Sequence, residues 1–160
     1  MPRRKILSAA DIALRIERQR QRGATIVLTT GCFDILHVGN VRLLAAARKL
    51  GDCLVVGVNS DATVRALKGS HRPVNEAKDR CEVLAALQAV DFVCVFSEAT
   101  PAELILRLRP SVFVKGGDYT LDRLPELSAV HEVGAALRLV PFQGGYSTSS
   151  ILARGSCSPV

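Results

Sequence analysis

Aromatic residues are scarce in this sequence, which has five Phe, two Tyr and no Trp among its 160 residues. They are not interleaved with the basic residues, whereas a surface that stacks nucleic-acid bases combines the two. The formal net charge of +6 nevertheless favours an anionic partner. We therefore expect an anionic partner other than nucleic acid, and a solvated helix face for the Arg-rich first part of the chain.

Long apolar runs are also absent, and none approaches the ~20 residues that span a bilayer. The amino-terminal Met-Pro-Arg-Arg-Lys is not followed by the apolar core of a secretory signal. We expect a cytoplasmic protein without a membrane partner. Its length, with 48% apolar and 22% charged residues, fits a single globular domain.

The five cysteines include no C-x-x-C pair, and their odd number does not suggest a disulfide framework. Cys53 and Cys94 lie in apolar, strand-like runs, where a thiol behaves as a small hydrophobic group. The three histidines are scattered and show no metal-ligand spacing. We therefore expect reduced, buried thiols and no metal ion held by protein side chains.

Predicted strands alternate with predicted helices along the whole chain. Strands are predicted at 25–29, 53–58, 91–96, 111–114 and 136–140, and most of them are continuously apolar. Helices are predicted at about 8–23, 41–50, 60–67, 124–133 and 147–152, with two more that begin at Asn75 and Thr100 as N-caps. This pattern indicates one doubly wound, Rossmann-like α/β domain around a five-stranded parallel sheet. We place an N-terminal helix at 1–23, the domain at 24–153 and a tail at 154–160.

Polar turns follow four of the five predicted strands, at 30–40, 59–61, 115–119 and 143–149, and three of these turns contain glycine. Ligands of such a sheet bind outside the carboxyl ends of its strands. Together the turns favour a site that handles phosphate. Taken alone, Gly116-Gly117 has the alternative interpretation of an ordinary turn.

The turn at 30–40 carries most of the predicted chemistry. Gly31 and Gly39 lack side chains where a ligand must approach the backbone. The helix after Gly39 directs free N–H groups and the positive end of its dipole at that gap, and His37 can donate a hydrogen bond to a phosphoryl oxygen. Ser147 and Thr148 resemble N-caps of the last helix, which would form a second anion site. Neither a Walker A loop nor G-x-G-x-x-G is present.

Gly31-Cys-Phe-Asp-Ile-Leu-His-Val-Gly-Asn40 resembles the G-x-F-D-x-x-H-x-G-H signature of the cytidylyltransferase-like nucleotidyltransferases. Further segments resemble the heptose 1-phosphate adenylyltransferases of that superfamily: Val58-Asn-Ser-Asp61, Leu67-Lys-Gly with Arg72-Pro73, Val114-Lys-Gly-Gly-Asp-Tyr119, and Ser147-Thr148. The similarity runs from Thr25 to about Leu152. It implies transfer of AMP from ATP to heptose 1-phosphate with release of pyrophosphate, Mg²⁺ carried by the triphosphate, and a homodimer.

The resemblance also implies a role for each matched residue. The implied catalytic residues are His37, Asn40 and Lys115. The implied nucleotide-binding residues are Gly31, Cys32, Phe33, Asp34, Gly39, Arg80, Gly116, Ser147 and Thr148, and the implied substrate-binding residues are Asn59, Asp61, Lys68, Arg72 and Asp118. Alternatives remain at three positions, since Lys68 and Arg72 could be solvated loop charges and Asp34 a local turn cap.

One position departs from the signature, because Asn40 stands where the family has its second histidine. An amide can donate a hydrogen bond to a phosphoryl oxygen, but it cannot carry a positive charge. Three explanations are open: a working variant, a relative that only binds nucleotide, or a deliberate substitution. A further enzyme alternative is a cytidylyltransferase for glycerol 3-phosphate or a phospho-alcohol.

Overall fold

The computed structural model describes residues 2–117, 124–141 and 146–155, and it contains a five-stranded, all-parallel sheet. The strands are β1 (Ile26–Gly31), β2 (Cys53–Asn59), β3 (Phe92–Phe96), β4 (Val112–Gly116) and β5 (Ala136–Val140). Their spatial order is β3-β2-β1-β4-β5. The prediction of a doubly wound α/β domain with a five-stranded parallel sheet is therefore confirmed.

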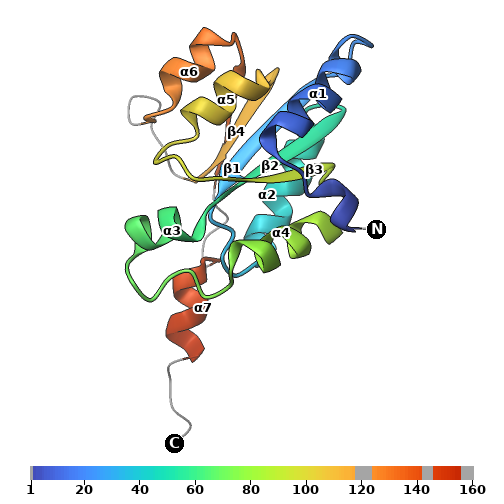
Figure 1. Ribbon diagram of the computed structural model, residues 1–160. Coiled ribbons are helices and arrows are strands. Elements are labelled where there is room, and N and C mark those ends of the chain that lie inside the picture. Colours follow the sequence, from blue (N-terminus) through green and yellow to red (C-terminus); the bar gives the residue numbers. More distant parts are fainter. Residues whose placement is uncertain (1, 118–123, 142–145, 156–160) are drawn as a thin grey trace, which may run out of the picture.

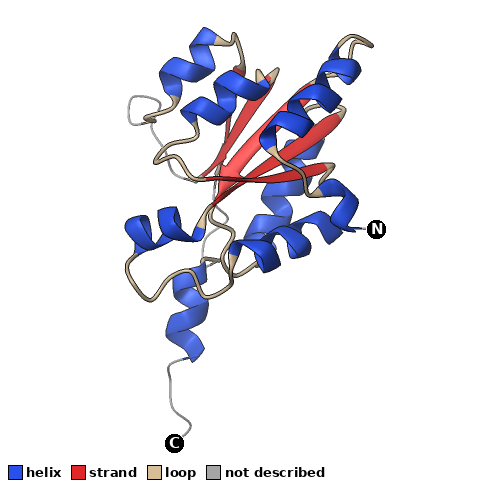
Figure 2. Cartoon of the chain, in the orientation of Figure 1, coloured by secondary structure: helices blue, strands red, loops and turns tan. Residues whose placement is uncertain are grey.

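Helices cover both faces of this sheet (Figures 1 and 2). They are η1 (Pro2–Lys5), α1 (Ala9–Arg20), α2 (Val38–Arg48), α3 (Asp61–Lys68), α4 (Ala77–Ala86), α5 (Ala102–Leu108), α6 (Leu127–Glu132) and α7 (Thr148–Gly155). Helices α1, α5 and α6 pack on one face, and α2 and α4 pack on the other. None of the helices in the described ranges combines the length and apolar character needed to cross a bilayer.

The first helix belongs to the same core as the strands. Ile12 and Ile16 of α1 are fully buried and pack with Ile105 of α5 and with Val55 of β2. The N-terminal segment also reaches the sheet edge, where the Leu7 N–H donates to the carbonyl of Val93 at 3.0 Å. Helix α1 is thus an integral layer of the fold, and the segment boundary between 23 and 24 stays a prediction.

Some helix starts agree with the sequence and others do not. Ser8 caps α1 as predicted, since its Oγ accepts a hydrogen bond from the Asp11 N–H at 3.1 Å. The N-cap of α5 is Pro101 rather than Thr100, because the chain still turns through 98–101 before the helix forms. Helix α2 begins at Val38, three residues earlier than predicted.

Helix α4 needs the largest correction, because its N-cap is Glu76 and not Asn75. The side-chain amide of Asn75 donates instead to the carbonyl of Asp34 at 2.6 Å. The first turn of α4 obtains its acceptor from another element, since the Ala77 N–H donates to Asp61 Oδ1 at 2.8 Å. The Asp61 carboxylate therefore accepts the hydrogen bond at the start of α4 that the sequence assigned to the side chain of Asn75.

The strand order fixes where a ligand can bind. From β1 the chain builds β2 and β3 on one side and then returns to build β4 and β5 on the other. In open α/β sheets the crevice forms where this reversal occurs, outside the carboxyl ends of the strands. Here that point lies between the ends of β1 and β4, at Gly31 and Gly116.

Candidate active site

A cavity of about 560 Å³ opens at this switch point, a size within the range of small-molecule sites. It brings together most of the residues that the sequence singled out. Its lining includes Gly31, Cys32, Phe33, Asp34, His37, Asn40, Asn59, Lys68, Arg72, Lys115, Gly116, Ser147 and Thr148. Gly39, Asp61 and Arg80 are not part of the lining, and Asp118 lies outside the described residues.

The turn after β1 has an unusual backbone at Phe33, whose φ of 47° lies in the left-handed region. The Phe33 ring folds back over Gly31, where an added Cβ would lie 3.1 Å from Cε2 of that ring. Glycine at 31 therefore leaves the space that the buried Phe33 side chain needs. Left-handed non-glycine residues are uncommon, and they cluster at functional sites.

His37 is the N-cap residue of α2 and lies against Gly39. A Cβ at Gly39 would stand 3.0 Å from both Nδ1 and Cε1 of the imidazole, so glycine is needed for the ring to lie there. His37 Nδ1 is buried and has no hydrogen-bond partner among the described residues. Burial lowers the pKa of His37 below its ordinary value, which favours the neutral form of the imidazole.

Asn40 fastens the same turn. Its Oδ1 accepts a hydrogen bond from the backbone N–H of His37 at 3.2 Å, which is one half of a capping box. Because a backbone N–H can only meet an acceptor, this contact identifies the oxygen and leaves the amide nitrogen as the group that a ligand can use. This contact lets α2 begin at Val38, three residues earlier than predicted, since Asn40, the third residue of the helix, binds the backbone N–H of the N-cap residue His37.

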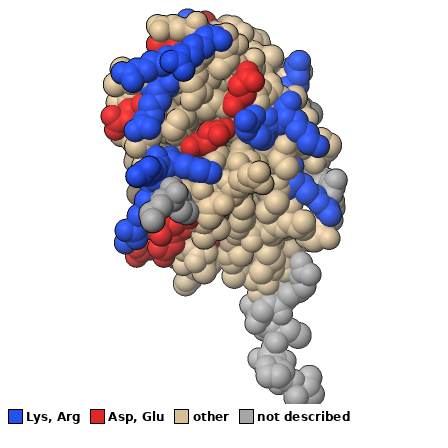
Figure 3. Space-filling view, turned by 90° about the vertical axis from the view of Figure 1, so that its right-hand side faces the viewer, with Lys and Arg blue, Asp and Glu red and all other residues tan. Residues whose placement is uncertain are grey.

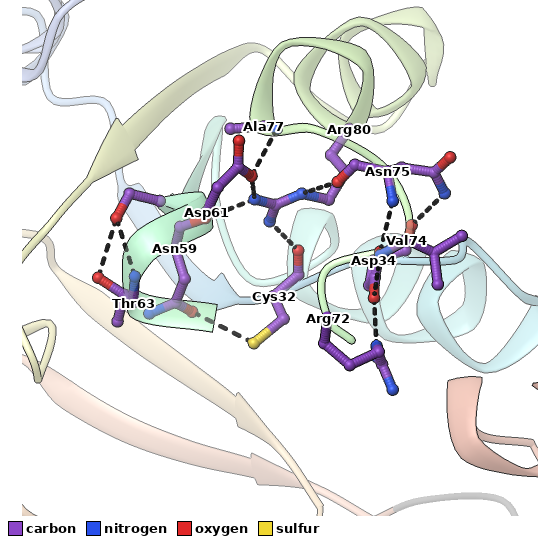
Figure 4. Close-up of polar contacts among 11 residues, drawn as sticks. Cys32, Asp34, Asn59, Asp61, Thr63, Arg72, Val74, Asn75, Ala77 and Arg80 are labelled. Atoms are coloured by element: carbon purple, nitrogen blue, oxygen red, sulfur yellow. Dashed lines mark hydrogen bonds and ion pairs between the residues drawn. The ribbon is translucent and has the colours of Figure 1, made fainter. Parts of the chain in front are cut away.

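Asp34 ties this turn to the loop before α4 (Figure 4). Its carboxylate accepts hydrogen bonds from the backbone N–H groups of Val74 and Asn75, at 2.8 and 2.9 Å, and from Arg72 Nε at 2.5 Å. Burial alone would raise the pKa of Asp34, but the bonds from Asn75, Val74 and Arg72 outweigh it and hold the pKa below its ordinary value. Asp34 is thus a long-range anchor that fixes Arg72 at the cavity edge, and not a local turn cap.

Arg80 lies behind the cavity wall and joins the ends of β1 and β2. Its side chain is fully buried, and Nη2 donates to the carbonyl of Asn59 at 2.8 Å and to Asp61 Oδ1 at 2.7 Å. The other two donors reach the carbonyls of Cys32 and Asn75, and Figure 4 shows how the four bonds fan out from one guanidinium. These contacts are those of a positioning residue, and triphosphate binding by Arg80 stays a prediction.

Asp61 has the same position behind the wall, since its Oδ1 is shared between Arg80 and the Ala77 N–H. Its predicted contact with a substrate likewise stays a prediction. Asn59, by contrast, does line the cavity, where its Oδ1 faces the Cys32 thiol at 3.8 Å.

Lys115 lines the wall beside β4, where its Nζ donates to Glu126 Oε1 at 2.6 Å. Glu126 is almost completely buried, at 1% exposure, and also lines the cavity. No pattern in the sequence singles out Glu126, because a glutamate at the start of a helix is not distinctive. Only the fold brings it to Lys115, from eleven residues further along the chain.

The start of α7 closes the cavity near α2. Ser147 caps α7 as predicted, since its Oγ accepts a hydrogen bond from the Ser150 N–H at 3.0 Å. Thr148 Oγ1 donates to the carbonyl of Ile35 at 3.4 Å, and the Arg42 guanidinium of α2 lies 5.8 Å from the centre of the Tyr146 ring. The N-termini of α2 and α7 therefore both border the same cavity, which makes two anion-binding helix ends available to one ligand.

Basic side chains lie in the cavity as well as on the surface. Lys68, Arg72 and Lys115 all line the cavity. On the face that Figure 3 shows, Lys and Arg side chains lie beside Asp and Glu side chains, and a broad uncharged area occupies the lower middle. Within the described residues, no group of three His, Cys, Asp or Glu side chains could hold a metal ion.

The sequence of the chain is similar to a known family and to several curated proteins. The Cytidylyltransferase-like family matches residues 28–154. The bifunctional protein HldE of Streptomyces coelicolor is 53% identical over 139 residues, which are 87% of this chain and 30% of that protein. HldE of Nitrosococcus oceani is 50% identical over 150 residues, which are 94% of this chain and 32% of that protein. The chain thus spans about 30% of the length of these curated relatives.

Two solved structures share the fold. A lipopolysaccharide core biosynthesis protein from Thermoplasma volcanium superposes with a TM-score of 0.64 at 28% identity, over 78% of this chain and 99% of its own. A pantoate-beta-alanine ligase from Francisella tularensis, at 12% identity, superposes with a TM-score of 0.61 over 88% of this chain and 67% of its own. The family model matches most of the chain, and relatives of about 50% identity cover over nine-tenths of it. The chain therefore belongs to the cytidylyltransferase-like family of nucleotidyltransferases.

Proposed function

We propose that this chain is an adenylyltransferase that acts on heptose 1-phosphate. An oxygen of the sugar phosphate attacks the α-phosphorus of ATP, the bond between that phosphorus and the oxygen bridging to the β-phosphorus breaks, and pyrophosphate leaves with the ADP-sugar as product. The observation that carries the proposal is a cavity that is bordered by two helix N-termini and lined by Lys68, Arg72 and Lys115. The roughly 50% identity to HldE proteins and the likeness to a lipopolysaccharide core biosynthesis protein support the sugar substrate.

The proposed chemistry is positioning and electrostatic stabilisation, without a covalent enzyme intermediate. His37, as a neutral imidazole, donates one N–H to an α-phosphate oxygen, and the amide nitrogen of Asn40 donates a second hydrogen bond there. Ser147 and Thr148, at the start of α7, hold the distal phosphates together with the free N–H groups of that helix.

The cations on the remaining walls accept the other charges. Arg72, which Asp34 holds at the cavity edge, and Lys68, which also lines the cavity, bind the phosphate of the incoming sugar in this scheme. Lys115 offsets the negative charge that develops as the bond to the leaving group lengthens. Mg²⁺ carried by the triphosphate neutralises part of its charge in this scheme, and no side chain of the described residues is assigned to hold it.

The decisive experiment measures pyrophosphate release by the purified chain with heptose 1-phosphate and each of the four nucleoside triphosphates. We expect turnover with ATP and little with CTP. Turnover with CTP and glycerol 3-phosphate instead would support the cytidylyltransferase alternative, and no turnover with any pair would refute transferase activity. The same preparation tests the proposed homodimer by light scattering.

A second candidate function rests on Asn40, because an amide replaces the second family histidine at the α-phosphate. The chain would then bind ATP without turning it over. Calorimetry that shows tight ATP binding by a chain with no turnover, together with activity gained by Asn40→His, would support this candidate over the first.

A further inference from the structure

Glu126 lies in the cavity wall, and helix capping does not account for its position there. It is the N-cap residue of α6, yet its side chain makes no capping hydrogen bond. Glutamate is not among the residues favoured at that position. The side chain is turned inward beside Leu124 and Pro125, with 1% of the residue exposed.

The carboxylate is also only half satisfied. Oε1 accepts from Lys115 Nζ at 2.6 Å, whereas Oε2 is buried and has no hydrogen-bond partner among the described residues. A buried acceptor without a donor costs free energy, and a buried ion pair is weak evidence for a purely stabilising role. Local rules that a sequence breaks without an evident compensating contact tend to mark functional sites.

The chemistry of this oxygen restricts what can complete it. A carboxylate oxygen needs a donor and repels phosphate, so a neutral donor suits Oε2 better than a phosphate group. Lys115, the cation beside it, is paired with the other oxygen, Oε1. Leu124 and Pro125, which precede Glu126 in the chain, also line the cavity and add apolar surface there. A donor next to an apolar surface describes a sugar ring, which offers hydroxyl groups at its edge and C–H groups on its face.

We propose that Glu126 is a specificity-determining residue whose Oε2 accepts a hydrogen bond from a sugar hydroxyl of a bound substrate, while Oε1 holds Lys115. The terminal torsion of a glutamate is soft, so a small rotation of the carboxylate presents Oε2 to the cavity. The proposal takes its ligands from the proposed function, and two sources offer this chemistry: the ribose of the nucleotide and the ring of the acceptor sugar. Replacing Glu126 removes the acceptor for either hydroxyl group, so separate measurements on the nucleotide and on the sugar are needed to tell the two sources apart.

The test is direct binding, measured by calorimetry on the full chain. In the ribose arm, whichever nucleoside triphosphate binds is compared with its 2′-deoxy and 3′-deoxy forms. In the sugar arm, heptose 1-phosphate is compared with its single-deoxy analogues in the presence of a non-hydrolysable ATP analogue. We expect the wild-type chain to prefer one hydroxyl-bearing ligand by about 10- to 100-fold over the form that lacks the hydroxyl.

Glu126→Met, which keeps the volume and removes both oxygens, should abolish that preference by weakening only the hydroxyl-bearing ligand. Glu126→Gln keeps a neutral acceptor and should retain part of the preference for the hydroxyl-bearing ligand. It replaces the methionine variant in the test if that variant does not fold. Glu132→Gln, an exposed glutamate on the same helix, is the matched control and should behave like wild type. The arm in which the preference disappears identifies the sugar.

Two results would overturn the role of Glu126: equal weakening of the hydroxyl-bearing and deoxy ligands in both arms, or no change in either. Failure of the proposed function has a different signature. In that case the wild-type chain releases no pyrophosphate with any substrate pair, whatever Glu126 does to the binding of nucleotide or sugar.

Discussion

Two buried charged side chains lie near the cavity on opposite faces of the sheet, Glu126 in its wall and Arg80 behind it, and their surroundings differ. Arg80, from α4, donates four hydrogen bonds to three carbonyls and the Asp61 carboxylate. Glu126, at the start of α6, has one oxygen paired with Lys115 and the other without a partner among the described residues. A group that the protein satisfies completely sets the shape of the site, whereas a group left incomplete is available to a ligand.

The same division separates the residues of the turn after β1. Asp34 has all its contacts within the protein and fastens two loops together. His37 has a buried Nδ1 without a partner in the described part of the chain and faces the cavity. The comparison thus distinguishes positioning residues from binding residues in one short segment, and each can be tested.

The largest effect is expected at Arg80, on the satisfied side. Arg80→Met removes every donor from a buried site and leaves the Asp61 carboxylate without its partner. Removing one partner of a buried pair costs about 3–5 kcal/mol, and the 35% exposure of the Asp61 side chain puts this case near the lower end. Urea denaturation measures this loss in the free energy of unfolding. Arg65→Met, at an exposed position on α3, should change it by less than about 0.5 kcal/mol. An Arg80→Met chain as stable as wild type that no longer binds ATP would make Arg80 a direct ligand instead.

On the unsatisfied side, His37→Ala should affect rate more than stability. Loss of one preorganised donor at the α-phosphate typically costs about 10²–10³-fold in kcat. The measurement is pyrophosphate release at saturating substrates, with His131→Ala on α6 as the exposed control. A variant that keeps a rate within threefold of wild type would remove His37 from the chemistry.

Asp34→Asn sharpens the comparison through pH. The pKa of Asp34 is lowered in the folded chain, so the ionised carboxylate stabilises the fold fully above its unfolded pKa of about 3.9. At pH 7 the variant should lose about 1–3 kcal/mol, because the hydrogen bonds from Val74 and Asn75 lose a charged acceptor. Below about pH 4 the difference from wild type should shrink as wild-type Asp34 becomes protonated. Urea unfolding from pH 7 to pH 3 measures both values, and a gap that widens on acidification would contradict the assignment.

Asn40→His should give the smallest change. In the free chain a neutral histidine can keep the contact with the His37 N–H, because one ring nitrogen then accepts. With nucleotide bound, a protonated histidine gives up that contact, since both of its nitrogens donate, but offers a charged donor to the α-phosphate. A charge-assisted hydrogen bond is roughly twice as strong as a neutral one, so we expect kcat to rise by about tenfold. Stability should stay within about 0.5 kcal/mol of wild type. An unchanged rate would show that Asn40 does not limit turnover.

Local pattern was enough for much of the fold. Apolar runs predicted all five strands to within two residues at each end, because a strand buried on both faces needs a continuous apolar sequence. Ser8 and Ser147 were correct as N-caps, because the acceptor and the N–H it serves lie within one turn of each other. Glycines at 31 and 39 marked the turn correctly, since both make room for a ring of that turn itself.

Contacts between distant segments were out of reach of such patterns. The sequence gave no sign of the contact between Arg80 and Asp61 behind the cavity wall, and their predicted roles in ligand binding stay predictions. It assigned the cap of α4 to Asn75, which the fold uses on Asp34. It gave no sign of Glu126, whose partner is known only once β4 and α6 lie side by side.

By itself, then, the sequence determined the order of elements, the parallel sheet and the turn that carries His37, since these follow from periodicity and short-range hydrogen bonds. Only the tertiary structure decided which polar side chains face the cavity and which form hydrogen bonds within the protein that fix the shape of the cavity. The reason is physical: whether a buried donor or acceptor is satisfied depends on partners that the chain brings from ten to fifty residues away, as for Asp34, Arg80 and Glu126.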